Sequence, residues 1–260
     1  MPGFRRLVFH FSWVTATAFG ACTAARADGG YEPITPYRPS VSSPAQLPAA
    51  GQVEAEIGGL RQRSDDSRRS SVPYLFKLAL DSEWGVLLGG EARVWQRDES
   101  GRAHGVGDTT LVLKRAWAVE EGKALGVELG AKLATANDTI GSGKTDLSMN
   151  TIYSHDIGAV HLDANVNAVR FGLREPGLSR TQWGASASLS TELLSQIALT
   201  GELSGTRRSG VESGAQILVA LTWSPSKLLT FDLGLARATR PTPATTSVFA
   251  GMVFPLARLW

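Results

Sequence analysis

The residues best suited to acid–base chemistry are two histidines that each have a carboxylate close by in the sequence. His161 and Asp163 fall on one face of an extended segment, and His104 precedes Asp108 by four positions. A histidine oriented by a carboxylate is the base of a hydrolase, but it needs a serine or similar nucleophile within reach. No serine has a recognisable spacing from these pairs. We therefore expect no catalytic residue and no enzyme, and a membrane hydrolase is the least favoured alternative.

Residues 141–145, Gly-Ser-Gly-Lys-Thr, imitate the end of a phosphate-binding loop. That motif needs a glycine where this chain has Asp138, and it needs a helix after the lysine to face a phosphate. An alternating segment follows instead, so nucleotide binding is not expected. The single cysteine, Cys22, lies near the amino terminus. Neither a disulfide nor a cysteine-bound metal is then available, and we expect no cofactor and no metal site.

The polar residues lie in a series of alternating segments that predict β-strands. Segments in which polar and apolar residues alternate recur with about 17 residues each, including the connection. A tilted membrane strand needs about 9 to 11 residues plus its turn, whereas strands of soluble sandwiches recur every 8 to 12 residues. The expected strands are 52–60, 73–81, 84–95, 107–117, 124–134, 145–154, 159–169, 181–191, 196–204, 214–223, 228–237 and 246–260. The pattern predicts an all-β fold, a transmembrane antiparallel up-and-down β-barrel of about twelve strands of the outer-membrane type.

The two faces of these strands differ in chemistry. One face is apolar over most of its length, and its arginines, Arg115, Arg237 and Arg258, lie near the strand ends, where a long side chain reaches water. Alternation alone does not say which face is inside. We assign the apolar face to lipid and the polar face to the lumen. The expected lumen residues are Glu54, Glu56, Lys77, Asp81, Glu91, Arg93, Asp108, Lys114, Glu128, Lys132, Asp146, Asn150, His161, Asp163, Asn165, Glu202 and Asp232.

Three further features favour an outer-membrane barrel. Short connections alternate with longer ones, as expected for periplasmic turns and outer loops. Aromatic residues at strand ends next to the short turns predict an interface girdle of Trp84, Trp117, Tyr153, Trp223 and Trp260. The last strand ends on Trp260 in phase with the apolar face, which resembles the terminal insertion signal of bacterial outer-membrane barrels. That resemblance implies contact with the barrel-assembly machinery.

The amino-terminal region divides in two. Arg5 and Arg6, an apolar stretch over 7–21 and the sequence Ala-Arg-Ala at 25–27 predict a signal peptide over residues 1–27 and export in a Gram-negative cell. Residues 28–50 contain prolines at 33, 36, 39, 44 and 48. Proline interrupts both helices and central strands. We expect residues 28–50 to form an extended periplasmic arm, with insertion into the lumen as the alternative, and residues 51–260 to form the barrel.

Residues 105–117 carry a family resemblance. A Gly-x-Gly-Asp before a strand, with Lys114 six residues after Asp108, resembles the outer-membrane "transporter" family named for the MetA pathway of phenol degradation. Residues 131–135 and 141–146 are similar to the next strand and loop of that family. The resemblance implies passage of small molecules, including aromatic or hydrophobic ones. From the residues alone, Asp108 and Lys114 lie some three pleats apart and must find partners on neighbouring strands.

These features favour a porin-like channel that passes small solutes across the outer membrane. Twelve strands lie between barrels filled by side chains and barrels with an aqueous pore. The excess of acids on the inner face predicts a preference for cations. The alternative is a closed structural barrel whose arginine-rich loops contact lipopolysaccharide or a partner. The small net charge of +2 points to no nucleic-acid partner.

Overall fold

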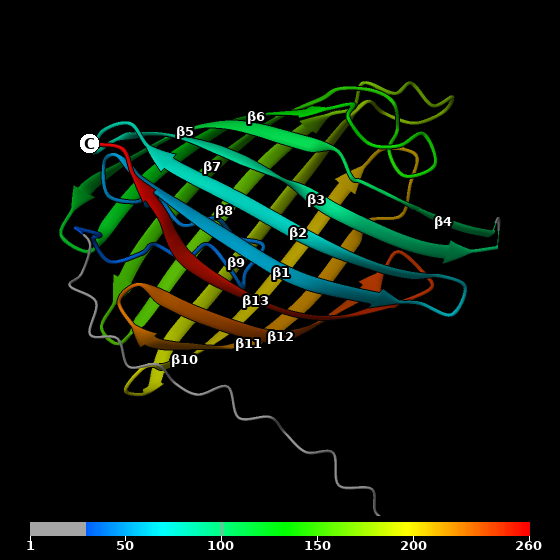
Figure 1. Ribbon diagram of the computed structural model, residues 1–260. Coiled ribbons are helices and arrows are strands. Elements are labelled where there is room, and N and C mark those ends of the chain that lie inside the picture. Colours follow the sequence, from blue (N-terminus) through cyan, green and yellow to red (C-terminus); the bar gives the residue numbers. More distant parts are fainter. Residues whose placement is uncertain (1–29, 100) are drawn as a thin grey trace, which may run out of the picture.

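The computed structural model describes residues 30–99 and 101–260, and the expected signal peptide lies outside them. The described chain is an antiparallel barrel (Figure 1). Among the described residues no helix is long and apolar enough to cross a membrane. The strands are β1 (Gln52–Arg63), β2 (Arg68–Ala79), β3 (Trp84–Asp98), β4 (Gly101–Gly105), β5 (Thr109–Glu120), β6 (Lys123–Leu133), β7 (Asp146–Ile157), β8 (Val160–Arg170), β9 (Thr181–Leu194), β10 (Ile197–Arg208), β11 (Gly214–Ser226), β12 (Leu229–Arg240) and β13 (Thr245–Arg258).

The barrel closes where its first strand meets its last. β1 pairs with β13 along its whole length, from Gln52 opposite Arg258 to Arg63 opposite Thr246. The remaining neighbours are consecutive in sequence, except that β3 pairs with β5 as well as with β2. The short β4 pairs with β3 alone among the described strands and forms a hairpin at the outer end. Closure leaves the wall without an edge, which a strand in lipid requires. The predicted twelve-stranded barrel is confirmed.

The alternation of side chains assigns lipid to the outside. Large apolar side chains of one phase lie exposed on the outer surface, including Leu129 (53%), Val166 (55%) and Leu233 (59%). Side chains of the other phase, such as Glu54 (0%) and Lys77 (0%), lie buried inside. Successive residues of a strand point to opposite faces, so one sequence can satisfy both solvents.

The two ends of the barrel differ as the connection lengths predict. At the end that holds the carboxyl terminus, two-residue turns contain Gly122 (φ +69°), Gly158 (φ +62°) and Gln196 (φ +75°). Two-residue hairpins need such positive φ values to match the twist of the strands. The other end carries the longer loops 134–145 and 171–180, with the five residues 141–145 in the first of them, and no helix follows there.

Two outer connections are shorter than expected because their strands continue. β1 and β2 extend to Arg63 and Arg68, and the connection expected over 96–106 is largely the β3–β4 hairpin. Arg61, Arg63, Arg68, Arg69 and Arg102, which the sequence placed in loops, therefore lie on strands.

The aromatic residues that the sequence predicts for an interface girdle lie at the end with the short turns. Trp84, Tyr153, Trp223 and Trp260 are 36–60% exposed on the outer surface. Trp117 flanks Arg115, whose guanidinium lies 5.2 Å from the ring of Trp117 and 5.4 Å from that of Trp84. Arg115 also forms an ion pair with Glu83 at 2.7 Å. This supports the expectation that Arg115 reaches water at the membrane edge.

Candidate functional site: a segment folded into the lumen

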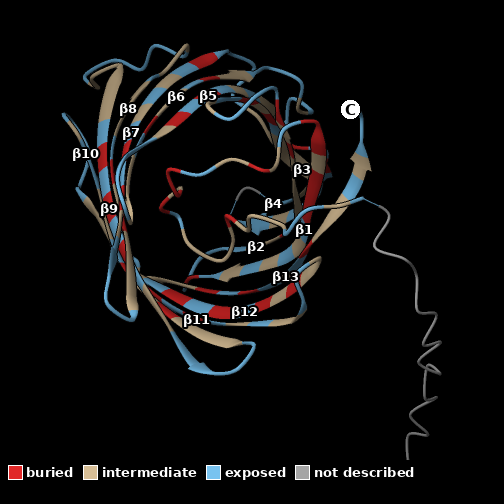
Figure 2. Cartoon of the chain, turned by 90° about the vertical axis from the view of Figure 1, so that its left-hand side faces the viewer, coloured by how far each residue is buried: buried red, intermediate tan, exposed pale blue. Residues whose placement is uncertain are grey.

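The proline-rich segment lies inside the barrel. Viewed along the barrel, residues 31–50 trace a loop across the lumen (Figure 2). The segment starts at the end with the short turns, where the Ile34 N–H donates to the Lys227 carbonyl, and it returns there to begin β1. The expectation of a periplasmic arm is thus wrong for the described part of this segment, and insertion into the lumen is correct. The physical reason is that wall side chains supply the hydrogen bonds that the segment cannot make with itself.

The first limb of the segment is held by carboxylates of β1. The Thr35 N–H lies 3.1 and 3.2 Å from the two Glu54 oxygens, and the Tyr37 N–H donates to Glu56 at 2.8 Å. The Arg38 N–H donates to the other oxygen of Glu56 at 3.2 Å. Buried backbone N–H groups need partners, and the prolines of this segment have none to satisfy. A proline-rich chain is therefore well suited to lie against a polar wall.

Tyr37 lies between two buried lysines. The Lys77 ammonium is 4.3 Å from the centre of the Tyr37 ring, and the Lys114 ammonium is 4.1 Å from it. Lys77 also pairs with Glu54 at 3.0 Å and Glu56 at 2.6 Å. The Tyr37 hydroxyl donates to the Gln46 carbonyl at 2.6 Å, which ties the two limbs of the segment together. Each cation–π contact contributes about 0.5–2 kcal/mol.

The Arg38 side chain lies in a site formed by β1, β12 and β13. Its Nε and Nη2 donate to the two oxygens of Asp232 on β12 at 2.8 and 2.9 Å. A Cβ added to Gly251 would lie 2.5 Å from Nε of Arg38, and one added to Gly58 would lie 2.9 Å from its Cζ. Only glycine leaves room for the guanidinium at these two positions. The ring of Phe249 lies 6.0 Å from the guanidinium.

The far end of the segment contacts β8, β9 and β10. The Val41 and Ser42 N–H groups both donate to Glu202, at 2.8 and 2.9 Å. The Ser42 hydroxyl donates to Ser186 at 2.9 Å, and the Ser43 N–H donates to Asn165 at 2.7 Å. The inner side chains of β9 include the small, buried Ser186 and Ser188, and the tip of the segment fits into the space beside them.

The returning limb lies over the candidate hydrolase residues. The Ala45 N–H donates to Ser154 at 2.7 Å, and the Ser154 hydroxyl donates to Asp163 at 2.5 Å. His161 lies between Asp163 (3.2 Å) and Asp156 (2.5 Å). Ser154 and His161 thus both contact a carboxylate, whereas a triad needs the serine to contact the histidine. The cluster is arranged as part of a charge network, and His104 lies apart from it on the β4 hairpin.

Further ion pairs link β5, β6 and β7 from the middle of the barrel to its outer end. Lys132 pairs with Asp108 at 2.8 Å and with Asp146 at 3.0 Å, and Lys114 pairs with Glu128 at 3.0 Å. Asp108 and Lys114 therefore do find their partners on neighbouring strands, as expected. These pairs brace the wall between β5, β6 and β7.

Two expected lumen residues lie elsewhere. Asp81 lies in the turn between β2 and β3, where it accepts the Glu83 and Trp84 N–H groups at 2.8 Å. In β3, Ala92 has no partner, because Val72 pairs with Arg93 and Pro73 pairs with Glu91. This bulge reverses the alternation, so Arg93 points outward beside Trp95 while Val94 is buried.

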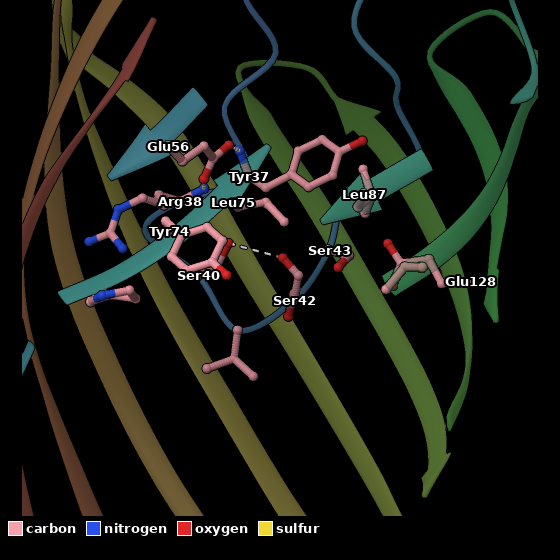
Figure 3. A pocket seen from close by; sticks show the side chains of 13 residues that line it. Tyr37, Arg38, Ser40, Ser42, Ser43, Glu56, Tyr74, Leu75, Leu87 and Glu128 are labelled. Atoms are coloured by element: carbon pink, nitrogen blue, oxygen red, sulfur yellow. Dashed lines mark hydrogen bonds between the residues drawn. The ribbon is translucent and has the colours of Figure 1, made fainter. Parts of the chain in front are cut away.

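The lumen on the outer side of the segment holds two cavities. One, of about 300 Å³, is lined by Tyr37, Arg38, Ser42 and Glu56 together with Leu75, Leu87 and Val112 (Figure 3). The other, of about 360 Å³, reaches from Val41 to the outer rim and is lined by Asn167, Ser186, Gln216 and Arg240 among others. We call these two cavities the outer vestibule.

Several functional residues were missed from the sequence. Leu75, Leu87 and Val112 point inward, and Leu218, Ala236 and Phe249 form a buried apolar cluster. Each of Leu75, Leu87, Val112 and Phe249 adjoins an apolar residue of the opposite face, so a run of consecutive apolar residues is the signal. Tyr37 and Arg38 were missed too, although an aromatic beside a cation stands out in a segment of prolines and serines.

Comparison with solved structures shows the fold of outer-membrane barrels. An outer membrane channel from Pseudomonas putida F1 superposes with a TM-score of 0.67 at 13% identity, covering 86% of this chain and all of that one. The NanC porin gives 0.59 at 8% identity, covering 78% and 100%, and the KdgM porin gives 0.55 at 9%, covering 78% and 99%. No protein-family model and no curated protein sequence match the chain. The resemblance to the phenol-degradation family thus stays a prediction.

Proposed function

We propose that this protein is an outer-membrane channel for small molecules whose lumen is closed by residues 31–50 at rest and opens when that segment leaves. The observation that carries the proposal is the kind of contact that holds the segment. Its main-chain N–H groups bind carboxylates of the wall, and its one arginine forms an ion pair with Asp232. Water can replace all of these polar contacts when the segment leaves.

The wall supports the same conclusion. Twelve strands leave a lumen that side chains alone do not fill, and here the inserted segment crosses that lumen and leaves the outer vestibule on its outer side. On the inner face of the wall, without the segment, carboxylates outnumber lysines. Glu54 and Glu56 share Lys77, and Asp108 and Asp146 share Lys132. An open lumen would thus favour cations over anions.

The residues that line the outer vestibule indicate what kind of solute it could hold. One side carries Leu75, Leu87 and Val112, and the other carries Asn167, Ser186 and Gln216. A wall that is apolar on one side and polar on the other fits a small molecule with a ring or chain and a few polar groups, including aromatic compounds. One solved structure of the KdgM porin holds oligogalacturonate. That ligand is a property of KdgM and does not identify the solute of this chain.

A reversible tether tests the proposal. Residues 28–260 contain no cysteine, and the Ser42 and Ser186 hydroxyls lie 2.9 Å apart. Ser42→Cys with Ser186→Cys should form a disulfide under oxidation and hold the segment in place. We expect uptake of small solutes by proteoliposomes to fall to background when oxidised and to recover when reduced, with either single variant unaffected. Uptake that is indifferent to the oxidation state would contradict opening by release of the segment, and no uptake in any form would favour a closed structural barrel.

A further inference from the structure

The outer face of the β1–β4 sheet carries an unusual row of arginines. Arg63 pairs with Arg68, Arg68 with Arg97, and Arg97 with Arg102, so four adjacent strands place an arginine at the same level. The residues next to them toward the membrane form a second row, in which Arg61, Ser70, Trp95 and His104 are paired in turn. Side chains directly opposite one another share a face, with Cβ atoms about 5 Å apart.

These side chains point away from the lumen. Trp95 is 48% exposed, whereas its neighbour Val94 is completely buried. Arg61, Arg63, Arg68, Arg97 and Arg102 are all exposed. On the inner face of the same strands, Arg69 forms a bidentate ion pair with Glu91. The bulge at Ala92 adds Arg93 to the outer set, which makes six arginines.

The outer arginines have no acidic partner within the described chain. None of the six forms an ion pair among residues 30–99 and 101–260, in contrast to Arg69, Arg115 and Arg208. The acids Asp65, Asp66, Asp98 and Glu99 lie at the hairpin tips beyond the row and share a cavity of about 320 Å³ with Arg68 and Arg97, but in the described chain they form no ion pair with these two arginines. Like charges directly opposite on a sheet are destabilising. Four in a row thus call for an anion outside the chain.

The height of the row on the barrel identifies the anion. Trp95 is an exposed aromatic at the outer end, where such rings mark the membrane interface. The arginine row lies two residues further out, about 7 Å beyond that level. Headgroup phosphates of the outer leaflet lie there, and the planar guanidinium matches phosphate with two hydrogen bonds. Sugars of a glycolipid would also pack against Trp95.

We propose that Arg63, Arg68, Arg97 and Arg102, with Arg61 and Trp95 below them, form a binding site for a phosphorylated outer-leaflet glycolipid of the lipid A type. The site rests on the outer-membrane location proposed above and is independent of the channel. Its row is about 14 Å wide, which is three strand spacings, and so has room for more than one phosphate.

The test compares two variants that lose the same charge. One replaces Arg63, Arg68, Arg97 and Arg102 by Gln, and the control replaces Lys144, Arg170, Arg174 and Arg207, which are exposed at the same end without forming such a row. Binding of bisphosphorylated lipid A and of the same lipid without phosphates is measured in detergent by native mass spectrometry, after an unheated gel confirms a folded barrel.

We expect the row variant to bind the phosphorylated lipid at least about ten-fold more weakly, with little change for the control and little affinity of either for the dephosphorylated lipid. An equal loss in both variants would show general electrostatics and overturn the site. Inorganic phosphate bound as tightly as the lipid would overturn the lipid assignment. Conductance of the row variant should equal that of the parent, so a failure here is separate from a failure of the channel proposal.

Discussion

Replacing Arg38 by Ala should favour the open barrel. The substitution leaves the buried carboxylate of Asp232 without its ion-pair partner, and this destabilises only the state in which the segment is in place. Asp232 has a side chain that is 1% exposed and Arg38 one that is 18% exposed, with two hydrogen bonds between them. Breaking a buried pair by removing one partner costs about 3–5 kcal/mol. Since Arg38 is partly exposed, we expect the substitution to destabilise the closed state by the smaller amount of about 2–3 kcal/mol.

That cost applies to the closed state alone. When the segment leaves, Asp232 faces lumen water whether or not Arg38 is present. Each 1.36 kcal/mol is a factor of ten in the equilibrium. Arg38→Ala should therefore raise the ratio of open to closed channels roughly 30- to 150-fold.

The assay is the open probability of single channels in planar bilayers. Arg38→Ala combined with Asp232→Ala is the matched control, because it removes the unpaired charge as well and should return most of the way to the parent, to within about five-fold. An Arg38→Ala channel that opens no more often than the parent, while a chain without the segment conducts, would refute the role of this ion pair. Equal effects of the single and double variants would refute the reasoning from burial.

Three other predictions follow from single contacts. Gly251→Ala places a Cβ 2.5 Å from Nε of Arg38, so it should raise the open probability, though less than Arg38→Ala, and single-channel recording should show no further rise when the two are combined. Tyr37→Leu loses two cation–π contacts and a hydrogen bond, whereas Tyr37→Phe loses the hydrogen bond alone; recordings should rank their open probabilities in that order, and equal values would exclude the ring contacts. In the turn between β2 and β3, the Glu83 and Trp84 N–H groups hold the pKa of Asp81 below its usual value; this contribution is complete above the ordinary pKa of about 3.9 and is lost as the pH falls through the lowered pKa. Urea unfolding should therefore show Asp81→Asn less stable than the parent at pH 7, and the difference should vanish at strongly acidic pH; a difference that persists there would contradict the turn assignment.

Much of the fold could be predicted from the sequence because the membrane imposes a simple code. A strand between lipid and a polar lumen must alternate, and closure requires a last strand that reaches the first. Each expected strand overlaps an observed one, and the strand expected over 246–260 contains β13, which closes the barrel by pairing with β1. Strand ends were less accurate, since β1, β2 and β3 extend beyond the expected segments at the outer end.

The site could be predicted only in part, because two of its features are not periodic. Alternation gave the inner set that includes Glu54, Glu202 and Asp232, but it failed at Arg93, where the bulge at Ala92 shifts the phase. The position of the proline-rich segment depends on hydrogen bonds between residues as distant as Val41 and Glu202. No local pattern encodes such contacts. The excess of inner acids over inner bases was the indirect signal that some other part of the chain must satisfy the remaining carboxylates.

The most direct test of the central claim is the ion conductance of residues 28–260 in a planar bilayer, recorded beside the same chain without residues 28–50. We expect rare openings from the longer protein. The shorter one should give steady currents whose reversal potential shows a preference for cations, since Glu54, Glu56, Glu202 and Asp232 lose their partners from the segment. Silence in both, or equal currents from both, would contradict the account.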